Sequence, residues 1–208
     1  VSPTQDPPVS DDETGTVAED KVLRVPASQG LLVGDTDPDG DPLTIVSFEV
    51  AGIPMAFAAG QMASIPGVGF IRINADGSYV FTPEHDYNGA VPVITYTVSD
   101  GHGGIDTGTL TLKVTPVNDR PIATNDDTST IQDRPVIIDV LGNDRDIDGD
   151  LLKVVMATSG NGTVRIGTDG RITFQPKPGF SGTATITYTI SDGHGGFSTA
   201  TVTIDVIE

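Results

Sequence analysis

An internal duplication constrains this sequence more than any other feature, because one fold must accommodate both copies. The segment Val33–Thr44 (VGDTDPDGDPLT) recurs as Gly142–Lys153 (GNDRDIDGDLLK) at an offset of 109 residues. The segment Thr95–Gly104 (TYTVSDGHGG) recurs almost unchanged as Thr187–Gly196 (TYTISDGHGG) at an offset of 92 residues. The 208 residues therefore form two related units, and the first unit carries extra residues in its interior.

The falling offset locates those extra residues. Tyr79–Pro83 (YVFTP) aligns with Ile172–Pro176 (ITFQP) at an offset of 93, so an insert of about 16 to 17 residues lies around Ala51–Gly67. This insert carries Met55 and Met62, together with Phe57. Two interpretations stay open: a loop that caps the edge of the first unit, or an exposed adhesive patch.

The boundary between the units repeats as well. Val1–Pro8 (VSPTQDPP) aligns with Val114–Pro121 (VTPVNDRP), so we place one unit at residues 1–117 and the other at 118–208. Because the chain starts in one such linker and stops just before the next, we expect the pair to belong to a longer array.

Hydrophobic residues alternate with a period of two, which indicates half-buried strands. In Thr183–Ile190 the residues Ala184, Ile186, Tyr188 and Ile190 share one face, and threonines occupy the other. The same pattern predicts strands around Ile94–Val98, Leu110–Val114, Val136–Val140, Leu151–Ala157, Gly162–Ile166, Arg171–Gln175 and Thr199–Val206. Short strands separated by Gly and Asp turns predict an all-β chain made of two tandem antiparallel β-sandwiches.

Composition narrows the possible partners. The chain has 29 acidic and 11 basic residues, a net charge of −18, and no cysteine. This charge argues against nucleic acid or an anionic membrane surface as a partner, because both would repel the chain. The absence of cysteine excludes disulfides and thiolate zinc sites. A metal bound by other ligands is then the obvious alternative means of stabilising the fold. No apolar run reaches the roughly 20 residues of a transmembrane helix.

The duplicated motif D-x-D-x-D-G-D carries the most specific chemistry. Its carboxylates are Asp35, Asp37, Asp39 and Asp41 in the first unit and Asp144, Asp146, Asp148 and Asp150 in the second. Two such charges 4 Å apart repel by about 4 kcal/mol at an effective dielectric of about 20, and a divalent cation relieves that repulsion. The spacing matches positions 1, 3, 5, 6 and 7 of a calcium loop. The alternative is a solvated Asp-Gly turn that binds nothing.

The motif is not a complete EF-hand, because Val46 and Val155 stand where the twelfth-position Glu is required. The remaining ligands must come from elsewhere, and Asp100 and Asp192 in the two S-D-G-H-G-G segments are the best candidates. Magnesium fits less well than calcium, because it usually retains several waters.

The linkers offer a further possibility. Asp6, Asn118 and Asp119 are candidates for an ion between the units, with Asp11–Asp12 and Asp126–Asp127 nearby in the chain. The alternative is an ordinary Asn-Asp turn before proline.

His102 and His194 occupy equivalent positions, and we interpret them as exposed turn residues. A zinc site would need further nitrogen or sulfur ligands, and His85 is the one other histidine of the chain. Because the sequence also lacks cysteine and a nucleophile elbow, it does not predict an enzyme.

The combination L-L-V-G-D-T-D-P-D-G-D-P-L-T, I-N-A-D-G-S-Y-V-F-T-P, Y-T-V-S-D-G and V-N-D-x-P resembles bacterial cadherin-like tandem repeats. Such repeats occur in large surface adhesins of the RTX type, which are secreted by type I systems. The resemblance covers nearly the whole chain. It implies Ig-like or cadherin-like sandwiches, Ca2+ binding, an extracellular location at the bacterial cell surface, and roles in attachment and biofilm formation.

Two functional hypotheses follow. In the first, the pair is an extender that calcium rigidifies within an adhesin. In the second, it binds directly, either to neighbouring repeats and other adhesin copies or to surface polysaccharide. The chain has no Trp and four Tyr, of which Tyr96 and Tyr188 are predicted to be buried, so little stacking surface is left for a sugar ring.

Overall fold

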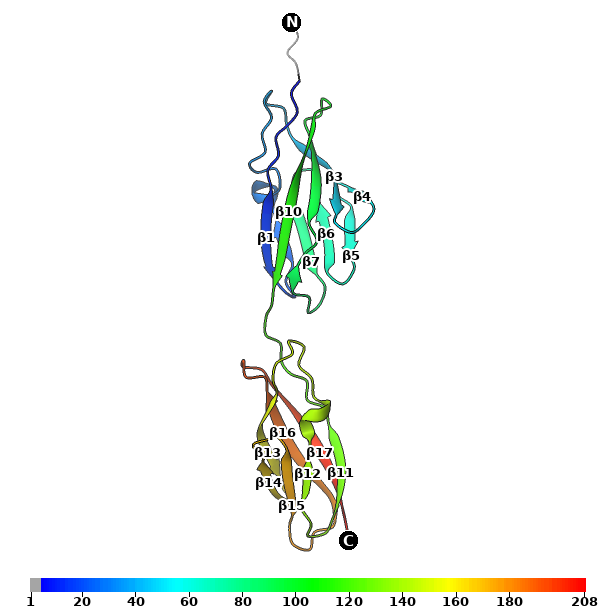
Figure 1. The fold of residues 1–208 in the computed structure, drawn as a ribbon, viewed down its shortest axis with the longest axis vertical. Helices are drawn as coiled ribbons and strands as arrows, with labels where there is room; N and C mark the ends of the chain where they lie inside the picture. Colours follow the sequence, from blue (N-terminus) through cyan, green and yellow to red (C-terminus); the bar gives the residue numbers. More distant parts are fainter. Residues whose placement is uncertain (1–4) are drawn as a thin grey trace. The chain divides into compact units, whose positions relative to one another are not determined.

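The computed structural model describes residues 5–208, which divide into two compact units between Val117 and Asn118 (Figure 1). Strands dominate both units, and the helical segments are the short 3-10 turns η1 (Ala27–Gln29) and η2 (Val140–Asn143). The fold is therefore all-β, as the alternating pattern predicts. In the described residues no helix is long and apolar enough to cross a membrane.

The first unit packs two sheets face to face. Its strands are β1 (Glu13–Ala18), β2 (Leu23–Val25), β3 (Thr44–Val50), β4 (Ala56–Ala58), β5 (Met62–Ile65), β6 (Gly69–Ile73), β7 (Tyr79–Pro83), β8 (Gly89–Ala90), β9 (Ile94–Ser99) and β10 (Ile105–Thr115). One sheet has the order β1-β10-β9-β3-β4, with β8 also paired to β10, and the other has the order β2-β7-β6-β5. Pairing is antiparallel except between β1 and β10, which run parallel.

The second unit repeats this arrangement with fewer strands. They are β11 (Asp126–Ile131), β12 (Val136–Ile138), β13 (Lys153–Ser159), β14 (Gly162–Ile166), β15 (Ile172–Pro176), β16 (Gly182–Ser191) and β17 (Phe197–Ile207). The sheets have the orders β11-β17-β16-β13 and β12-β15-β14, and β11 again runs parallel to β17.

The insert of the first unit supplies one edge strand to each sheet. Strand β4 pairs with β3, and β5 pairs with β6. Phe57 of β4 is 9% exposed and stacks on Phe48, with ring centroids 5.3 Å apart and an interplanar angle of 21°. Met55 and Met62 stay exposed. The insert thus extends both sheet edges, as the capping interpretation predicts, while its two methionines face solvent.

The cores follow the predicted alternation. Strand β16 alternates buried Ala184, Ile186, Tyr188 and Ile190 with threonines on the other face. Branched and aromatic side chains favour a pleated surface with one buried and one wet face, which explains why these segments become strands.

Candidate metal centres

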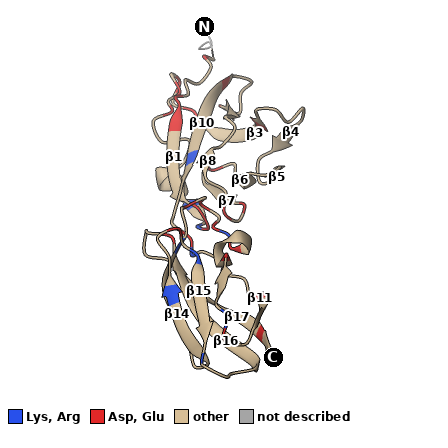
Figure 2. Cartoon of the chain, turned by 60° about the horizontal axis from the view of Figure 1, so that its bottom comes forward, with Lys and Arg blue, Asp and Glu red and all other residues tan. Residues whose placement is uncertain are grey.

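Acidic residues lie mainly in the connections between strands, and the strands themselves carry few charges (Figure 2). This separation follows from chemistry, because Asp stabilises turns by accepting hydrogen bonds from its own backbone, whereas a strand with one buried face prefers branched residues. The candidate sites are therefore formed by loops that a rigid scaffold holds in place.

In the second unit the loop after η2 curls around one carboxylate. Asp146 Oδ1 accepts hydrogen bonds from the backbone N–H of Asp148 (3.0 Å) and of Asp150 (3.2 Å), and Gly149 has a φ of 79°. The glycine permits the left-handed conformation that closes the turn. One oxygen from each of the three Asp side chains lies within 4.8 Å of the others. The loop therefore gathers three of the predicted ligands around one point.

The first unit builds its loop by the same hydrogen bonds. Asp37 Oδ1 accepts from the backbone N–H of Asp39 (2.8 Å) and of Asp41 (3.2 Å), and Gly40 has a φ of 81°. Each loop is thus an Asx-type turn that its own sequence determines.

The other oxygen of each central Asp provides a test for a cation. Asp37 Oδ2 and Asp146 Oδ2 are buried and have no hydrogen-bond partner. A buried, unpaired carboxylate oxygen costs free energy, and buried polar groups in folded proteins are nearly always satisfied by protein, water or an ion. Oxygen donors from Asp are the ligands that calcium prefers. The donor chemistry of both loops therefore suits calcium. Within the described residues, three loop carboxylates come within 4.8 Å of one another in the second loop but not in the first.

The linkers hold the loops through backbone contacts. Asp6 N–H donates to Asp39 Oδ2 (2.8 Å), and at the equivalent position Asp119 N–H donates to Asp148 Oδ2 (2.7 Å). Asn118 donates its side-chain amide to an oxygen of Asp192 (2.9 Å). An ion held by Asp6, Asn118 and Asp119 stays a prediction.

Asp100 and Asp192 organise the S-D-G-H-G-G turns. Asp192 Oδ1 accepts from the backbone N–H of His194 (2.7 Å) and of Gly196 (2.9 Å), and its Oδ2 accepts from Gly196 (3.0 Å) and from the amide of Asn118. The hydrogen bond from Asn118, ahead of those from the turn backbone, lowers the pKa of Asp192.

Asp100 makes the equivalent bonds to His102 and Gly104. A Cβ at Gly104 or Gly196 would lie 2.1 Å from the carboxylate, which explains the glycine at both positions. These hydrogen bonds assign both Asp residues a turn-building role, and a further role as calcium ligands stays a prediction.

Asp35 accepts hydrogen bonds from the backbone N–H of Asp11 (3.0 Å) and from the hydroxyl of Ser10 (3.1 Å), in the segment that precedes β1. Tyr96 donates toward Glu13 Oε2 and contacts the backbone oxygen of Asp11 (3.0 Å), and one ligand atom each of Asp11, Glu13 and Asp35 fall within 4.8 Å of one another. Burial raises the pKa of Glu13 to about 7, and nearby Asp11 adds to the shift. Burial also raises the pKa of Asp35.

Asp144 has the same position in the second unit. Tyr188 Oη lies 2.8 Å from the backbone oxygen of Thr124, 3.1 Å from Asp126 Oδ2 and 3.3 Å from Asp144 Oδ1. Burial raises the pKa of both Asp126 and Asp144. The first Asp of each motif therefore belongs to a carboxylate–tyrosine cluster that ties the start of the unit to its core. The repeated tyrosine and the acids at the start of β1 and β11 were the available sequence signal for this cluster.

A further acidic group occurs in the first unit only. Asp20, His85 and Asp86 offer ligand atoms within 4.8 Å of one another, and His85 Nδ1 lies 2.6 Å from Asp86. The duplication cannot reveal this group, because Pro178 and Gly179 occupy the positions of the second unit equivalent to His85 and Asp86.

Residues 5–116 match the bacterial cadherin-like domain family, and residues 118–205 match the bacterial Ig domain family. The first match covers more than half of the chain. This chain belongs to the bacterial cadherin-like domain family. Cadherin-like and Ig-like families are typically non-enzymatic. The match of this chain to them supports its assignment as an extracellular repeat module. No curated protein matches the chain.

Solved structures support the cadherin-like fold. Human CDH23 EC21-23 aligns over 94% of this chain and 67% of its own, with a TM-score of 0.54 and 15% identity. The protocadherin GammaB4 extracellular domain aligns over 97% of this chain and 34% of its own, with a TM-score of 0.52 and 15% identity. An endo-fucoidan hydrolase of glycoside hydrolase family 107 also aligns, with a TM-score of 0.36 and 21% identity over 96% of this chain. The chain spans 28% of the length of that hydrolase.

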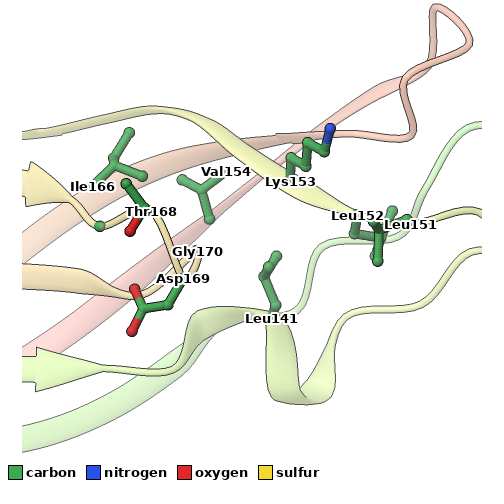
Figure 3. A pocket seen from close by; sticks show the side chains of 10 residues that line it. Leu141, Leu151, Leu152, Lys153, Val154, Ile166, Thr168, Asp169 and Gly170 are labelled. Carbon is green, nitrogen blue, oxygen red and sulfur yellow. The ribbon is translucent and has the colours of Figure 1, made fainter.

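The Ig-like unit has a shallow hollow beside the turn between β14 and β15. Leu141, Leu152 and Val154 surround it, with Asp169 on the turn (Figure 3). Strands β3 and β6 of the cadherin-like unit correspond to β13 and β14 of the Ig-like unit. The insert joins β3 to β6, and its residues Ala59 and Gly60 donate backbone N–H groups to these two strands. The hollow thus marks the place where the Ig-like unit lacks an insert, and its lining is mainly apolar.

Proposed function

We propose that this chain is a pair of calcium-binding modules of a bacterial surface adhesin, which calcium rigidifies so that they act as an extender in cell attachment and biofilm formation. The supporting observation is the buried, unpaired carboxylate oxygen at the centre of each loop, Oδ2 of Asp37 and of Asp146. The resemblance of the repeated motifs to type I-secreted RTX adhesins supports the adhesin context.

The loops connect calcium to stiffness through their position. Each loop leads directly toward a core strand, β3 or β13, and receives a backbone hydrogen bond from the segment that enters its unit. When calcium binds, it neutralises carboxylates that otherwise repel one another at short range. A neutralised loop holds the entering segment and the sheet in one arrangement, so the unit resists deformation.

A thermal melt in EDTA, repeated across a calcium titration from micromolar to about 10 mM, tests this proposal. Extracellular calcium modules bind at about 0.1–1 mM. Saturation at about 10 to 100 times the dissociation constant then stabilises each site by about 1.4–2.7 kcal/mol. We expect a clear upward shift of the thermal midpoint with calcium and a smaller shift with magnesium. An unchanged midpoint would show that the loops are solvated turns.

One surface favours direct binding as a second function. The outward side of the sheet β2-β7-β6-β5 exposes Met62 (56%) and Phe70 (44%) next to the exposed Arg72. Met62 and Arg72 are paired across neighbouring strands, so the apolar and basic groups form one surface. Sedimentation of the chain and pull-down on insoluble polysaccharide, each with and without calcium, test this function. Negative results in both assays would argue against direct binding and leave the extender as the remaining proposed function.

A further inference from the structure

We infer that His102 and His194 are positioning residues of the two calcium loops, an inference that rests on the proposed function. His194 Nδ1 lies 2.9 Å from Asp150 Oδ2, and His102 Nδ1 lies 3.1 Å from Asp41 Oδ2. An ionised carboxylate accepts hydrogen bonds but cannot donate them, so Nδ1 carries the proton and donates. Both units therefore place a ring N–H on the last carboxylate of the loop.

Each histidine is itself anchored. The backbone N–H of His194 donates to Asp192 Oδ1 at 2.7 Å, inside the S-D-G-H-G-G turn. The backbone N–H of Asp150 is meanwhile held by Asp146 Oδ1 at 3.2 Å. Asp150 is thus fixed at its backbone by the loop and at its side chain by the turn. A carboxylate that a donor holds through one oxygen presents the other oxygen in a defined direction.

The two units differ in one informative respect. Gln5 donates its side-chain amide to Asp41 Oδ2 at 2.7 Å, beside the bond from His102. At the equivalent position of the second unit stands Asn118, whose amide donates to Asp192 instead. Asp41 therefore keeps a side-chain donor when His102 is removed. The second loop depends more strongly on its histidine.

Both rings are accessible enough to be replaced cleanly. The side chain of His102 is 55% exposed, and that of His194 is 63% exposed. Substitution at such positions usually changes stability little. Removal of a group that orients a metal ligand commonly weakens metal affinity by about 10- to 100-fold. We therefore expect His194→Ala to weaken calcium binding of the second loop about 10-fold or more, and His102→Ala to weaken the first loop less.

Isothermal titration of the full chain with CaCl2 tests the inference. The calcium affinity of the first loop is measured in chains that also carry Asp146→Asn, and that of the second loop in chains that also carry Asp37→Asn. His194→Asn restores an N–H donor close to the position of Nδ1 and should recover most of the affinity. Thr185→Ala, at an exposed position of β16, is the control. Melts in EDTA should be the same for all histidine variants.

The outcomes separate the two proposals. If the unsubstituted chain takes up no calcium, the proposed function fails. If it binds calcium and His194→Ala binds equally well, the positioning inference alone is overturned. Equal losses from His102→Ala and His194→Ala would overturn the compensating role of Gln5 at Asp41. A His194→Asn variant that stays as weak as His194→Ala would overturn the positioning inference, because a restored N–H donor should recover affinity.

Discussion

In the side chains of Asp37 and Asp146, the two carboxylate oxygens have different roles. One oxygen accepts two backbone N–H groups and shapes the turn, while the other is buried without a partner. The turn can form without metal, because its hydrogen bonds are local. Calcium should therefore stabilise a conformation that the loop already adopts.

Asp146→Asn distinguishes these two tasks. The Asn side-chain oxygen can still accept the hydrogen bonds of the turn, so in EDTA the thermal midpoint should stay the same or rise slightly as repulsion decreases. With calcium, the second loop should lose at least about 10-fold in affinity, because a charged ligand is removed. Calorimetry with and without calcium measures both effects. Asp205→Asn, an exposed position on β17, is the control, and a calcium response as weak in that variant would contradict this assignment.

Glu13 gives the metal-free protein a pH dependence. Burial raises the pKa of its carboxyl from 4.5 to about 7, so the folded first unit binds a proton more tightly than the unfolded chain. This contribution to stability is complete below about pH 4.5 and is lost as the pH rises through about 7. In EDTA, the thermal midpoint of the first unit should fall from pH 5 to pH 8.

Glu13→Gln should flatten this dependence, because the amide does not titrate. Asp35, Asp126 and Asp144 also have raised pKa values, so a weaker decline of the same sign should persist in the variant. Circular dichroism melts at several pH values measure the slope. An unchanged slope in Glu13→Gln would assign the dependence to the other carboxylates.

Strands β4 and β5 show how one insert changes an element. Two short edge strands extend two different sheets, and a single aromatic side chain, Phe57, connects the insert to the core by stacking on Phe48. The second unit passes directly from β13 to β14 and leaves both edges open. The insert therefore increases the buried surface of one unit without altering its topology.

Phe57→Ala should destabilise the first unit by about 3 kcal/mol, a value typical of a buried aromatic ring replaced by alanine. The free energy of unfolding from urea titration measures the loss. Met55→Ala, at a 57% exposed position of the same insert, should change stability by less than about 0.5 kcal/mol. Similar losses in the two variants would contradict the view that Phe57 anchors the insert.

At the scale of the molecule, the charge of −18 opposes folding through repulsion among loops that carry most of the acid. Salt screens this repulsion: the Debye length falls from about 30 Å at 0.01 M to about 8 Å at 0.15 M. Under the proposed function calcium neutralises carboxylates of the two loops, whereas sodium chloride screens charges over the whole surface. Added sodium chloride should therefore replace part of the stabilisation that calcium provides, and calcium part of that provided by salt.

In EDTA, raising sodium chloride from about 0.01 M to about 0.15 M should raise the thermal midpoint by about 2–8 °C, if screening contributes about 1 kcal/mol. In saturating calcium the same change of salt should have a smaller effect, because the loop carboxylates are already neutralised. Differential scanning calorimetry under the four conditions measures this difference. A larger salt effect in calcium than in EDTA would contradict it.

The sequence by itself determined the local structure. The period of two specified which residues of β16 face the core, including Tyr188, and the spacing D-x-D-G-D specified a turn whose hydrogen bonds join residues two and four positions apart. These interactions are short in range, so their pattern can be read directly from the chain. Because the sequence is duplicated, each of these patterns occurs in both units.

Only the tertiary structure decided which distant groups meet. Glu13 reaches Tyr96 across 83 residues, and His194 reaches Asp150 across 44. The parallel pairing of β1 with β10 and of β11 with β17 also draws the start of each unit against its tyrosine, where Asp144 meets Tyr188. Strand register and sheet order set these contacts, and neither is encoded in the spacing of a local motif.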